Sequence, residues 1–451
     1  MGVIIMKKYL KFILGLVAVA ALCGCQNSGE QASGSDTINA DYKIHISGED
    51  WGCGTSQAIL SLDNVVDSVS KDDFVVTETK QVTDFSKAPE FPVIETTVDR
   101  TVTDVYLCDE NGERTDSASK YVALDLYISP DEGSPLLYSP KTNFNSWSDP
   151  YYLTISLSDS AKLTSNGTEV TTFKVSQEYT SKTTDADMMK TDTFKSSNGL
   201  EYKYGYYEPE QETDTLVVWL HGIGEGGTEN TDPYVNVLAN KVTSLFGDEF
   251  QSIMGGAYFL APQCPTYWMD GDGKMTNSQN GGIQADGTSY YTDSLDELID
   301  SYKEKVGAEK VVITGASNGG YMTMLLAIKN PDKYDAIVPI CEALPNQFIT
   351  DEQISSLVDL PMFFIYSNDD NVVDPTLCEI PTIERLRAAG AKNLHVSTTD
   401  EVIDTSGNYK DENGNPYKYS GHWSWIYFDN NESLSDETGI SCWEWMAEQV
   451  K

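Results

Sequence analysis

The chain has 451 residues, and its 70 acidic and 30 basic residues give a formal net charge of −40 at pH 7. A field of that sign repels phosphate backbones, which argues against nucleic acid or an anionic membrane surface as the partner. Hydrophobic residues make up 40% of the sequence, a composition typical of a folded globular protein and not of a disordered one. The length exceeds what one ordinary core supports and predicts two domains.

The N-terminus has the features of an export signal. Lys7, Lys8 and Lys11 precede the apolar run FILGLVAVAAL, and small residues follow it. This order is typical of a secretory signal peptide, and the apolar run is too short to span a bilayer as a mature helix. We therefore expect residues 1–25 to be a signal peptide and residues 26–37, which are polar and rich in Gly and Ser, to be a flexible linker.

The end of this signal, Leu22-Cys23-Gly24-Cys25, resembles the lipobox of bacterial lipoproteins. The resemblance implies that Cys25 is lipidated, so that the protein is exported and held on the cell surface by a lipid anchor in the membrane. A plain signal peptide without lipid is the alternative. Six further cysteines have no metal-site spacing, and the sequence is compatible both with disulfides and with free buried thiols.

Residues 38–180 have the pattern of an all-β domain. The runs FVVTETKQV, TVTDVYLCD and YVALDLYIS are rich in β-branched and aromatic residues, and only SQAILSLDNVV is ambiguous between helix and strand. Short strands at regular spacing predict a β-sandwich. The segment GEDWGCGTSQAILSLD resembles the N-terminal immunoglobulin-like domain found before some bacterial esterases. We expect this domain to space the catalytic site or partly cover it.

Residues 181–451 have the pattern of an α/β domain, in which apolar strands alternate with amphipathic helices. Leu295, Leu298 and Ile299 lie on one face of a predicted helix that ends at Gly307. Such alternation predicts a doubly wound, mostly parallel sheet with functional residues at the carboxyl ends of its strands. The predicted strands are Leu216–Leu220, Ala257–Ala261, Val311–Thr314, Ala336–Ile340, Met362–Tyr366 and Leu394–Thr398.

The segment GASNG, from Gly315 to Gly319, matches the pattern G-x-S-x-G between a predicted strand and a predicted helix. The turn is so tight that the residues two positions either side of Ser317 must be small, and the hydroxyl is pushed clear of the backbone. The pattern alone fits many glycine-rich turns, but its position favours a nucleophile. A serine nucleophile also needs a base, an acid and an anion pocket.

Four histidines are candidates for the base. His422 lies in the loop YSGHWSWIYF after the last predicted strand, where the chain order Ser, Asp, His places the base in folds with this motif. His45 lies in the β-domain and His221 comes too early in the chain. His395 lies inside a predicted strand and is the second candidate. The sequence therefore favours His422.

The orienting acid is expected in NDDNVVDP, directly after the strand MFFIYS. Asp370 is followed by Asn371 and two valines, which resembles the pattern after the acid of related hydrolases. We predict Asp370 as the acid, with Asp369 as the runner-up. Asp374 is expected to cap the following turn.

The glycine-rich run LVVWLHGIGEGG contains G-x-G-x-x-G between Gly222 and Gly227, so a dinucleotide site is one hypothesis. The next strand ends in Gln263, which offers no acid for a ribose hydroxyl, and an exported protein would meet little NAD. The better interpretation is an oxyanion loop. Its N–H groups would be those of Ile223, or alternatively Gly224, together with that of Asn318.

Two side chains near this anion pocket raise separate expectations. If Asn318 acts through its backbone N–H, its side chain should be the more replaceable part of the residue. Glu225 is an unusual residue beside an anion pocket, and we expect it to be buried and paired so that it holds the loop.

Taken in order, LVVWLHGIGEGG, FLAPQCP, GASNGGYMT, NDDNVV and GHWSW resemble the motifs of the α/β-hydrolase superfamily. They are similar to those of secreted bacterial esterases akin to polyhydroxyalkanoate depolymerases, and of prolyl oligopeptidase catalytic domains, over about residues 192–451. The resemblance implies that Ser317 attacks an ester while His422 and Asp370 assist, with no metal or organic cofactor. Glu342 is a departure, because relatives tend to carry glycine there, and it is expected to reshape the acyl side of the pocket.

Aromatic residues near the predicted strand ends either pack in the core or line the substrate pocket. Trp268 and Trp423 are the predicted substrate contacts, with Tyr267 and Trp425 nearby, as a wall for an aryl acyl group or a sugar ring. On an anchored surface protein they favour acetyl or feruloyl-like esters of polysaccharides, or other small esters. A peptidase of the same superfamily is one alternative, although the β-domain is too short for a gating propeller. A catalytically inactive glycan-binding lipoprotein is the other.

Overall fold

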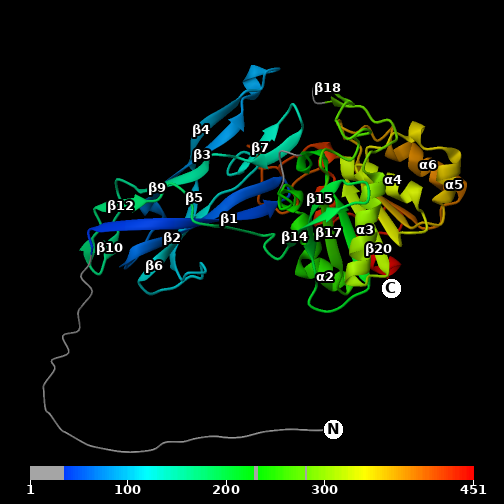
Figure 1. Cartoon of the computed structure of the whole chain (residues 1–451). Helices are drawn as coiled ribbons and strands as arrows, with labels where there is room; N and C mark the ends of the chain where they lie inside the picture. Colours follow the sequence, from blue (N-terminus) through cyan, green and yellow to red (C-terminus); the bar gives the residue numbers. More distant parts are fainter. Residues whose placement is uncertain (1–34, 228–231, 280–281) are drawn as a thin grey trace, which may run out of the picture.

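The computed structural model describes residues 35–227, 232–279 and 282–451. The predicted signal peptide, including Cys25, lies outside the described residues. Two bodies follow each other along the chain, a β-rich one and an α/β one, and β7 lies between them (Figure 1). Within the described ranges, no helix has both the length and the apolar character needed to cross a membrane.

The N-terminal body is an immunoglobulin-like sandwich. Its strands are β1 (Thr37–Glu49), β2 (Gly52–Val66), β3 (Phe74–Thr83), β4 (Val93–Arg100), β5 (Val102–Cys108), β6 (Ser119–Leu126), β7 (Leu136–Ser139), β8 (Phe144–Trp147), β9 (Tyr151–Leu157), β10 (Thr164–Ser165), β11 (Thr168–Glu169), β12 (Thr172–Val175) and β13 (Lys182–Thr184). One sheet has the order β12-β1-β2-β6-β5 with β13 also on β1, and the other has the order β4-β3-β9. Every second residue of β1 is buried, because one face of the strand lies on the core.

The all-β prediction for this body is confirmed, and the ambiguous run SQAILSLDNVV belongs to strand β2. The boundary predicted at residue 180 is too early. Strand β13 lies beyond it and pairs in parallel with β1, with Lys182 opposite Ile44. The segment around β13 is polar and short, so it carried no alternation of apolar residues that could mark it as a strand.

The second body is built on an eight-stranded sheet of order β14-β15-β17-β16-β20-β21-β22-β23. Its strands are β14 (Lys190–Lys195), β15 (Glu201–Tyr207), β16 (Thr215–Leu220), β17 (Tyr258–Gln263), β20 (Lys310–Ala316), β21 (Ala336–Ile340), β22 (Met362–Ser367) and β23 (Leu394–Thr399), with a separate short pair β18 (Ser278–Gln279) and β19 (Gly282–Ile283). The sheet is parallel from β17 to β23, whereas β14 and β15 form an antiparallel edge. The doubly wound, mostly parallel prediction is confirmed, and the antiparallel edge was not predicted.

Helices cover both faces of this sheet. They are α1 (Val235–Leu238), α2 (Asp248–Met254), α3 (Thr292–Val306), α4 (Asn318–Lys329), α5 (Asp351–Ser356), α6 (Glu379–Ala389), α7 (Trp425–Asp429) and α8 (Cys442–Gln449). Alternate residues of β16 enter different hydrophobic clusters: Leu216 and Val218 join the cluster of α3 to α6, whereas Val217 and Trp219 join that of α2, α7 and α8. The second of these clusters continues into the sandwich, so the two bodies share one hydrophobic core.

The six cysteines within the described residues are all buried, and none of them is in a disulfide. Of the two states compatible with the sequence, the structure has the free buried thiols. The sandwich is instead held by packing and by hydrogen bonds between its sheets. Tyr42 of β1 is fully buried, and its hydroxyl accepts the N–H of Leu153 in β9 at 2.9 Å while lying 3.0 Å from the Gln177 carbonyl.

Replacing Tyr42 with phenylalanine should lower the free energy of unfolding by about 1–3 kcal/mol, because the buried N–H of Leu153 loses its acceptor. Urea denaturation followed by circular dichroism measures this change. Tyr127→Phe is the matched control, since Tyr127 is 40% exposed and its hydroxyl can bond water. Equal midpoints for the two variants would show that the bond between the sheets contributes nothing.

Candidate active site

Ser317 stands on a sharp turn between β20 and α4. Its φ is +56°, in the left-handed region that residues other than glycine rarely adopt. A Cβ at Gly319 would lie 1.8 Å from the Leu220 carbonyl oxygen, and one at Gly315 would lie 2.7 Å from the same atom. Both positions must therefore be glycine, as the steric argument from the sequence requires. The Ser317 N–H donates to the Ile340 carbonyl at 2.8 Å, which holds the turn over β21.

His422 lies between the serine and an acid. Its Nε2 is 2.9 Å from Ser317 Oγ, and its Nδ1 is 2.7 Å from Asp370 Oδ2. The other carboxylate oxygen of Asp370 accepts the N–H groups of Val372 at 2.8 Å and Val373 at 2.9 Å. With Nδ1–H held by the carboxylate, Nε2 is the nitrogen free to accept the serine proton. The structure thus brings together the three residues selected from the sequence.

The competing candidates lie elsewhere. His395 Nδ1 is 2.8 Å from Ser435 Oγ, in a structural position on β23. Asp369, the runner-up acid, accepts the Ser367 hydroxyl at 2.7 Å and pairs with a surface lysine. Asp374 accepts the N–H of Thr376 at 2.9 Å and caps the following turn as predicted.

The predicted oxyanion loop forms a short 3-10 turn over Ile223–Glu225, directly after β16. Ile223 and Asn318 each begin a helical turn, and the first N–H groups of such turns have no acceptor within the turn. Ile223 lines the same cavity as Ser317. The two N–H groups proposed from the sequence are therefore available beside the nucleophile, and their use by an oxyanion stays a prediction.

His221 anchors this loop, a role that the sequence did not suggest. It is fully buried, with Nδ1 2.5 Å from the Gly222 carbonyl and Nε2 accepting the Cys264 N–H at 2.9 Å. Burial lowers the pKa of its imidazole to about 4, so the ring stays neutral and bridges the loop to the end of β17. Gln263, the last residue of β17, donates its side-chain amide to the Glu225 carbonyl at 2.9 Å.

Glu225 is buried and paired, as expected from the sequence. Only 5% of the residue is exposed. Burial raises the pKa of its carboxyl to about 7, while hydrogen bonds from the Asn145 side chain and from backbone groups, including that of Gly222, oppose the rise. Asn145 belongs to β8 of the sandwich, so the partner of this loop residue comes from the other body.

Two sequence predictions about side chains are wrong. The Asn318 side chain is a structural part of the site, because the residue is 1% exposed and its Oδ1 accepts the Trp268 N–H at 2.5 Å. Trp268 is not a substrate contact, because its ring is fully buried and packs against His221 and Tyr202. The two residues join α4 to the loop after β17 and belong to the core that supports the site.

Glu342 does not reshape the pocket either. It is fully buried behind α4, where its Cα would lie 2.9 Å from a Cβ at Gly320. Its Oε2 accepts the Leu344 N–H at 2.6 Å, and burial raises the pKa of the carboxyl to about 8. The acid is part of the packing under the nucleophile turn.

A cavity of about 490 Å³ opens over the triad and contains Ser317 and His422. Trp423, predicted as a substrate contact, lines it. The sandwich also supplies part of its wall, which the sequence could not show. The residues of the sandwich that line the cavity are Trp51, Tyr138, Asn143 and Asn145.

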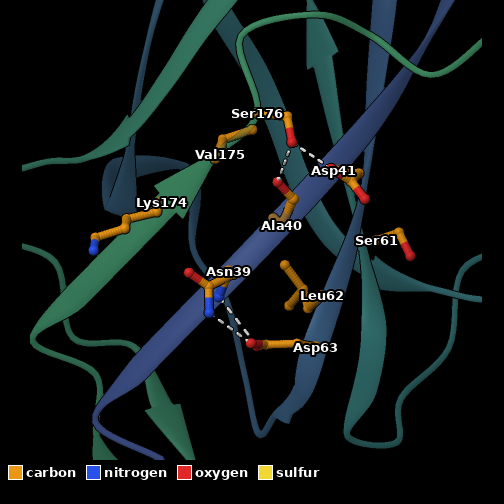
Figure 2. A pocket seen from close by; sticks show the side chains of 9 residues that line it. All are labelled: Asn39, Ala40, Asp41, Ser61, Leu62, Asp63, Lys174, Val175 and Ser176. Atoms are coloured by element: carbon orange, nitrogen blue, oxygen red, sulfur yellow. Dashed lines mark hydrogen bonds between the residues drawn. The ribbon is translucent and has the colours of Figure 1, made fainter.

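Another hollow, of about 480 Å³, lies on β1, β2 and β12 of the sandwich (Figure 2). Its polar side chains bond one another: Asn39 donates to Asp63 at 2.8 Å, and the Ser176 hydroxyl donates to Asp41. Neither a serine–histidine pair nor an anion pocket is found among its lining residues. The cavity over Ser317 is therefore the candidate active site.

Comparison with known families agrees with this architecture. Residues 41–189 match the esterase Ig-like N-terminal domain, and residues 206–401 match the phospholipase/carboxylesterase family. The chain has an α/β-hydrolase fold preceded by an immunoglobulin-like domain. None of the curated protein sequences compared with this hydrolase matches it.

Solved structures resemble the hydrolase to different extents. A thermostable esterase is 20% identical, with a TM-score of 0.65, and the match covers 87% of this chain and 96% of that one, which shows a common fold. A ferulic acid esterase is 14% identical with a TM-score of 0.34, over 47% of this chain and 90% of its own. The naproxen esterase of Bacillus subtilis is 12% identical with a TM-score of 0.32, over 55% and 92%.

Glu225→Gln should change how the stability of the hydrolase depends on pH. The folded carboxyl has a pKa of about 7 against an ordinary 4.5, so its contribution to stability falls as pH rises between these values. The free energy of unfolding of the variant, relative to the wild type, should therefore rise by up to about 3 kcal/mol from pH 4.5 to pH 8.

Urea denaturation at a series of pH values measures this difference. Glu201→Gln is the control, because Glu201 is exposed and should give curves parallel to those of the wild type. Parallel curves for Glu225→Gln as well would mean that this carboxyl ionises freely in the folded protein.

Proposed function

We propose that the hydrolase is a serine carboxylic-ester hydrolase that works through an acyl-enzyme. The observation that carries the proposal is the line of hydrogen bonds from Ser317 through His422 to Asp370, with Ser317 and His422 lining a cavity. The match to the phospholipase/carboxylesterase family supports ester bonds as the target.

In the first half of the reaction, Ser317 Oγ attacks the ester carbonyl while His422 Nε2 takes its proton. Asp370 Oδ2 holds Nδ1–H and stabilises the imidazolium, and the Val372 and Val373 N–H groups keep the carboxylate in place. The negative charge that develops on the carbonyl oxygen would be bound by the N–H groups of the oxyanion loop and of α4. His422 then gives its proton to the leaving alcohol.

In the second half, water attacks the acyl group on Ser317 with His422 as the base. The tetrahedral species passes through the same anion pocket, and its collapse releases the acid and restores the serine hydroxyl. The short contact between Ser317 and His422 carries the serine proton at the start and returns it at the end, whereas His422 exchanges protons directly with the leaving alcohol and with the attacking water.

The cavity lining supports an ester of a carbohydrate or another small molecule as the substrate. Trp423 and Trp425 form an aromatic surface beside His422, with ring centroids 6.1 Å apart. Trp51 and Asn143 of the sandwich add a further ring and an amide. Rings and amides together suit a sugar face or an aryl acyl group. The expected export of the chain would bring it to polysaccharides that carry acetyl or feruloyl-like esters.

Ser317→Ala should lower kcat on 4-nitrophenyl acetate by about 10⁴-fold or more, because no other group replaces the nucleophile. His422→Ala should cause a loss of similar size. His395→Ala is the matched control, since His395 bonds Ser435 away from the cavity, and its kcat should stay close to that of the wild type. Full activity of Ser317→Ala would overturn the proposed function.

A substrate panel tests the ester assignment. Acetylated xylan, methyl ferulate and 4-nitrophenyl acetate should be hydrolysed, whereas a proline-containing peptide anilide should not. Ser317→Ala is the blank for every substrate. Preferential cleavage of the anilide would indicate a peptidase, and no turnover of any ester would favour a binding protein.

A further inference from the structure

The hairpin of β7 and β8 leaves the sandwich and lies on the oxyanion loop of the hydrolase body. Phe144 at the start of β8 is 5% exposed and belongs to the hydrophobic cluster of the hydrolase body. The Phe144 ring can lie this close to the loop because Gly227 has no side chain. A Cβ at Gly227 would be only 2.3 Å from the ring. At the other end of β8, Trp147 Nε1 donates to Asp232 Oδ2 at 2.6 Å. The strand is therefore held at one end by the contact with Gly227 and at the other by the bond to Asp232.

Asn145, between these two anchors, reaches the loop itself. Its Nδ2 would lie 2.7 Å from a Cβ at Gly224, so a side chain at Gly224 would exclude the amide. The same amide lies near enough to the Glu225 carboxyl to oppose the rise of its pKa, and Glu225 Oε2 lies 3.2 Å from the Cβ position of Gly222. The amide and the carboxyl thus lie against the backbone of the turn at Gly224 and Gly222.

The sheet side of the loop is held by other contacts, from His221 to the Gly222 carbonyl and from Gln263 to the Glu225 carbonyl. Ile223 lies between these anchored residues. Its neighbours Gly222 and Gly224 have no side chains that could fix the backbone. The position of the Ile223 N–H therefore depends on the residues that contact this backbone, which are His221 and Gln263 together with Asn145 and Glu225. Of these, Asn145 is supplied by the immunoglobulin-like domain.

We propose that Asn145 is a positioning residue, through which the immunoglobulin-like domain holds Glu225 and sets the place of the Ile223 N–H in the oxyanion hole. This inference rests on the proposed function. It gives the domain a part in the rate of the chemical step, beyond spacing or covering the site. The amide acts through the loop and need not touch the substrate.

Four variants test the proposal with 4-nitrophenyl acetate at pH 8. Asn145→Ala should lower kcat by about 10-fold with KM within about 2-fold, a part of the loss that follows removal of an oxyanion donor. Asn145→Asp should lower it further, because two carboxyl groups then face each other. The double variant Asn145→Asp/Glu225→Gln exchanges donor and acceptor, and its kcat should return to within about 3-fold of the wild type.

Ser146→Ala is the matched control. Ser146 is the next residue of β8, so its side chain is on the opposite face of the strand from that of Asn145. The kcat of Ser146→Ala should therefore stay within about 2-fold of the wild type. A raised KM with unchanged kcat in Asn145→Ala would overturn the proposal and make Asn145 a substrate contact. Failure of the double variant to recover would also overturn it, because the effect would not pass through Glu225.

A failure of this inference can be told apart from a failure of the proposed function. If Ser317→Ala is inactive and the Asn145 variants behave like the wild type, only the positioning role falls. If Ser317→Ala keeps full activity, both the proposed function and the positioning role of Asn145 are overturned.

Discussion

The site depends on one close approach between two backbones. Gly319, at the start of α4, lies against the carbonyl of Leu220 at the end of β16, with no room for a methyl group between them. The oxyanion loop begins immediately after Leu220, and the serine immediately precedes α4. This contact therefore sets the distance between the two N–H groups expected to bind the oxyanion, and any side chain at Gly319 would separate them.

A second constraint comes from outside the α/β body. The hydrophobic cluster that packs under one face of the large sheet runs on into the sandwich, and Asn430 after α7 donates to Asp50 in the β1–β2 turn at 2.9 Å. Trp51 in the same turn contacts Tyr409 edge to face. A core shared in this way leaves little freedom for one body to move on the other. The part of the cavity wall supplied by the sandwich is consequently held in place by this shared core.

The sequence was sufficient where function depends on local patterns in a known chain order. Ser317 lies between small residues, Asp370 follows a strand and His422 follows the last strand, so each could be located from its neighbours. Trp268 and Asn318 were misjudged because burial is decided by contacts between distant segments. A tryptophan near a strand end has the same local pattern whether its ring faces the cavity or the core.

The contribution of the sandwich to the cavity could not be predicted from the sequence, for a related reason. Trp51 and Asn145 have no local feature that distinguishes them from other residues of a β-domain. They meet the site only through the way the two bodies dock, which depends on many apolar contacts at once. His221 is a similar case, since its task follows from the Gly222 carbonyl and the Cys264 N–H on either side of its ring.

The buried thiols affect where the chain can mature. Burial raises the pKa of Cys53 to about 12, and it holds those of Cys264, Cys341 and Cys442 well above the usual range. The thiolate is the form that reacts with oxidants and with other disulfides. In the folded protein these four thiols are therefore held in the protonated form, which reacts poorly with oxidants. Within the residues that the structure describes there is no disulfide, so the folding of this part requires no oxidase or disulfide isomerase.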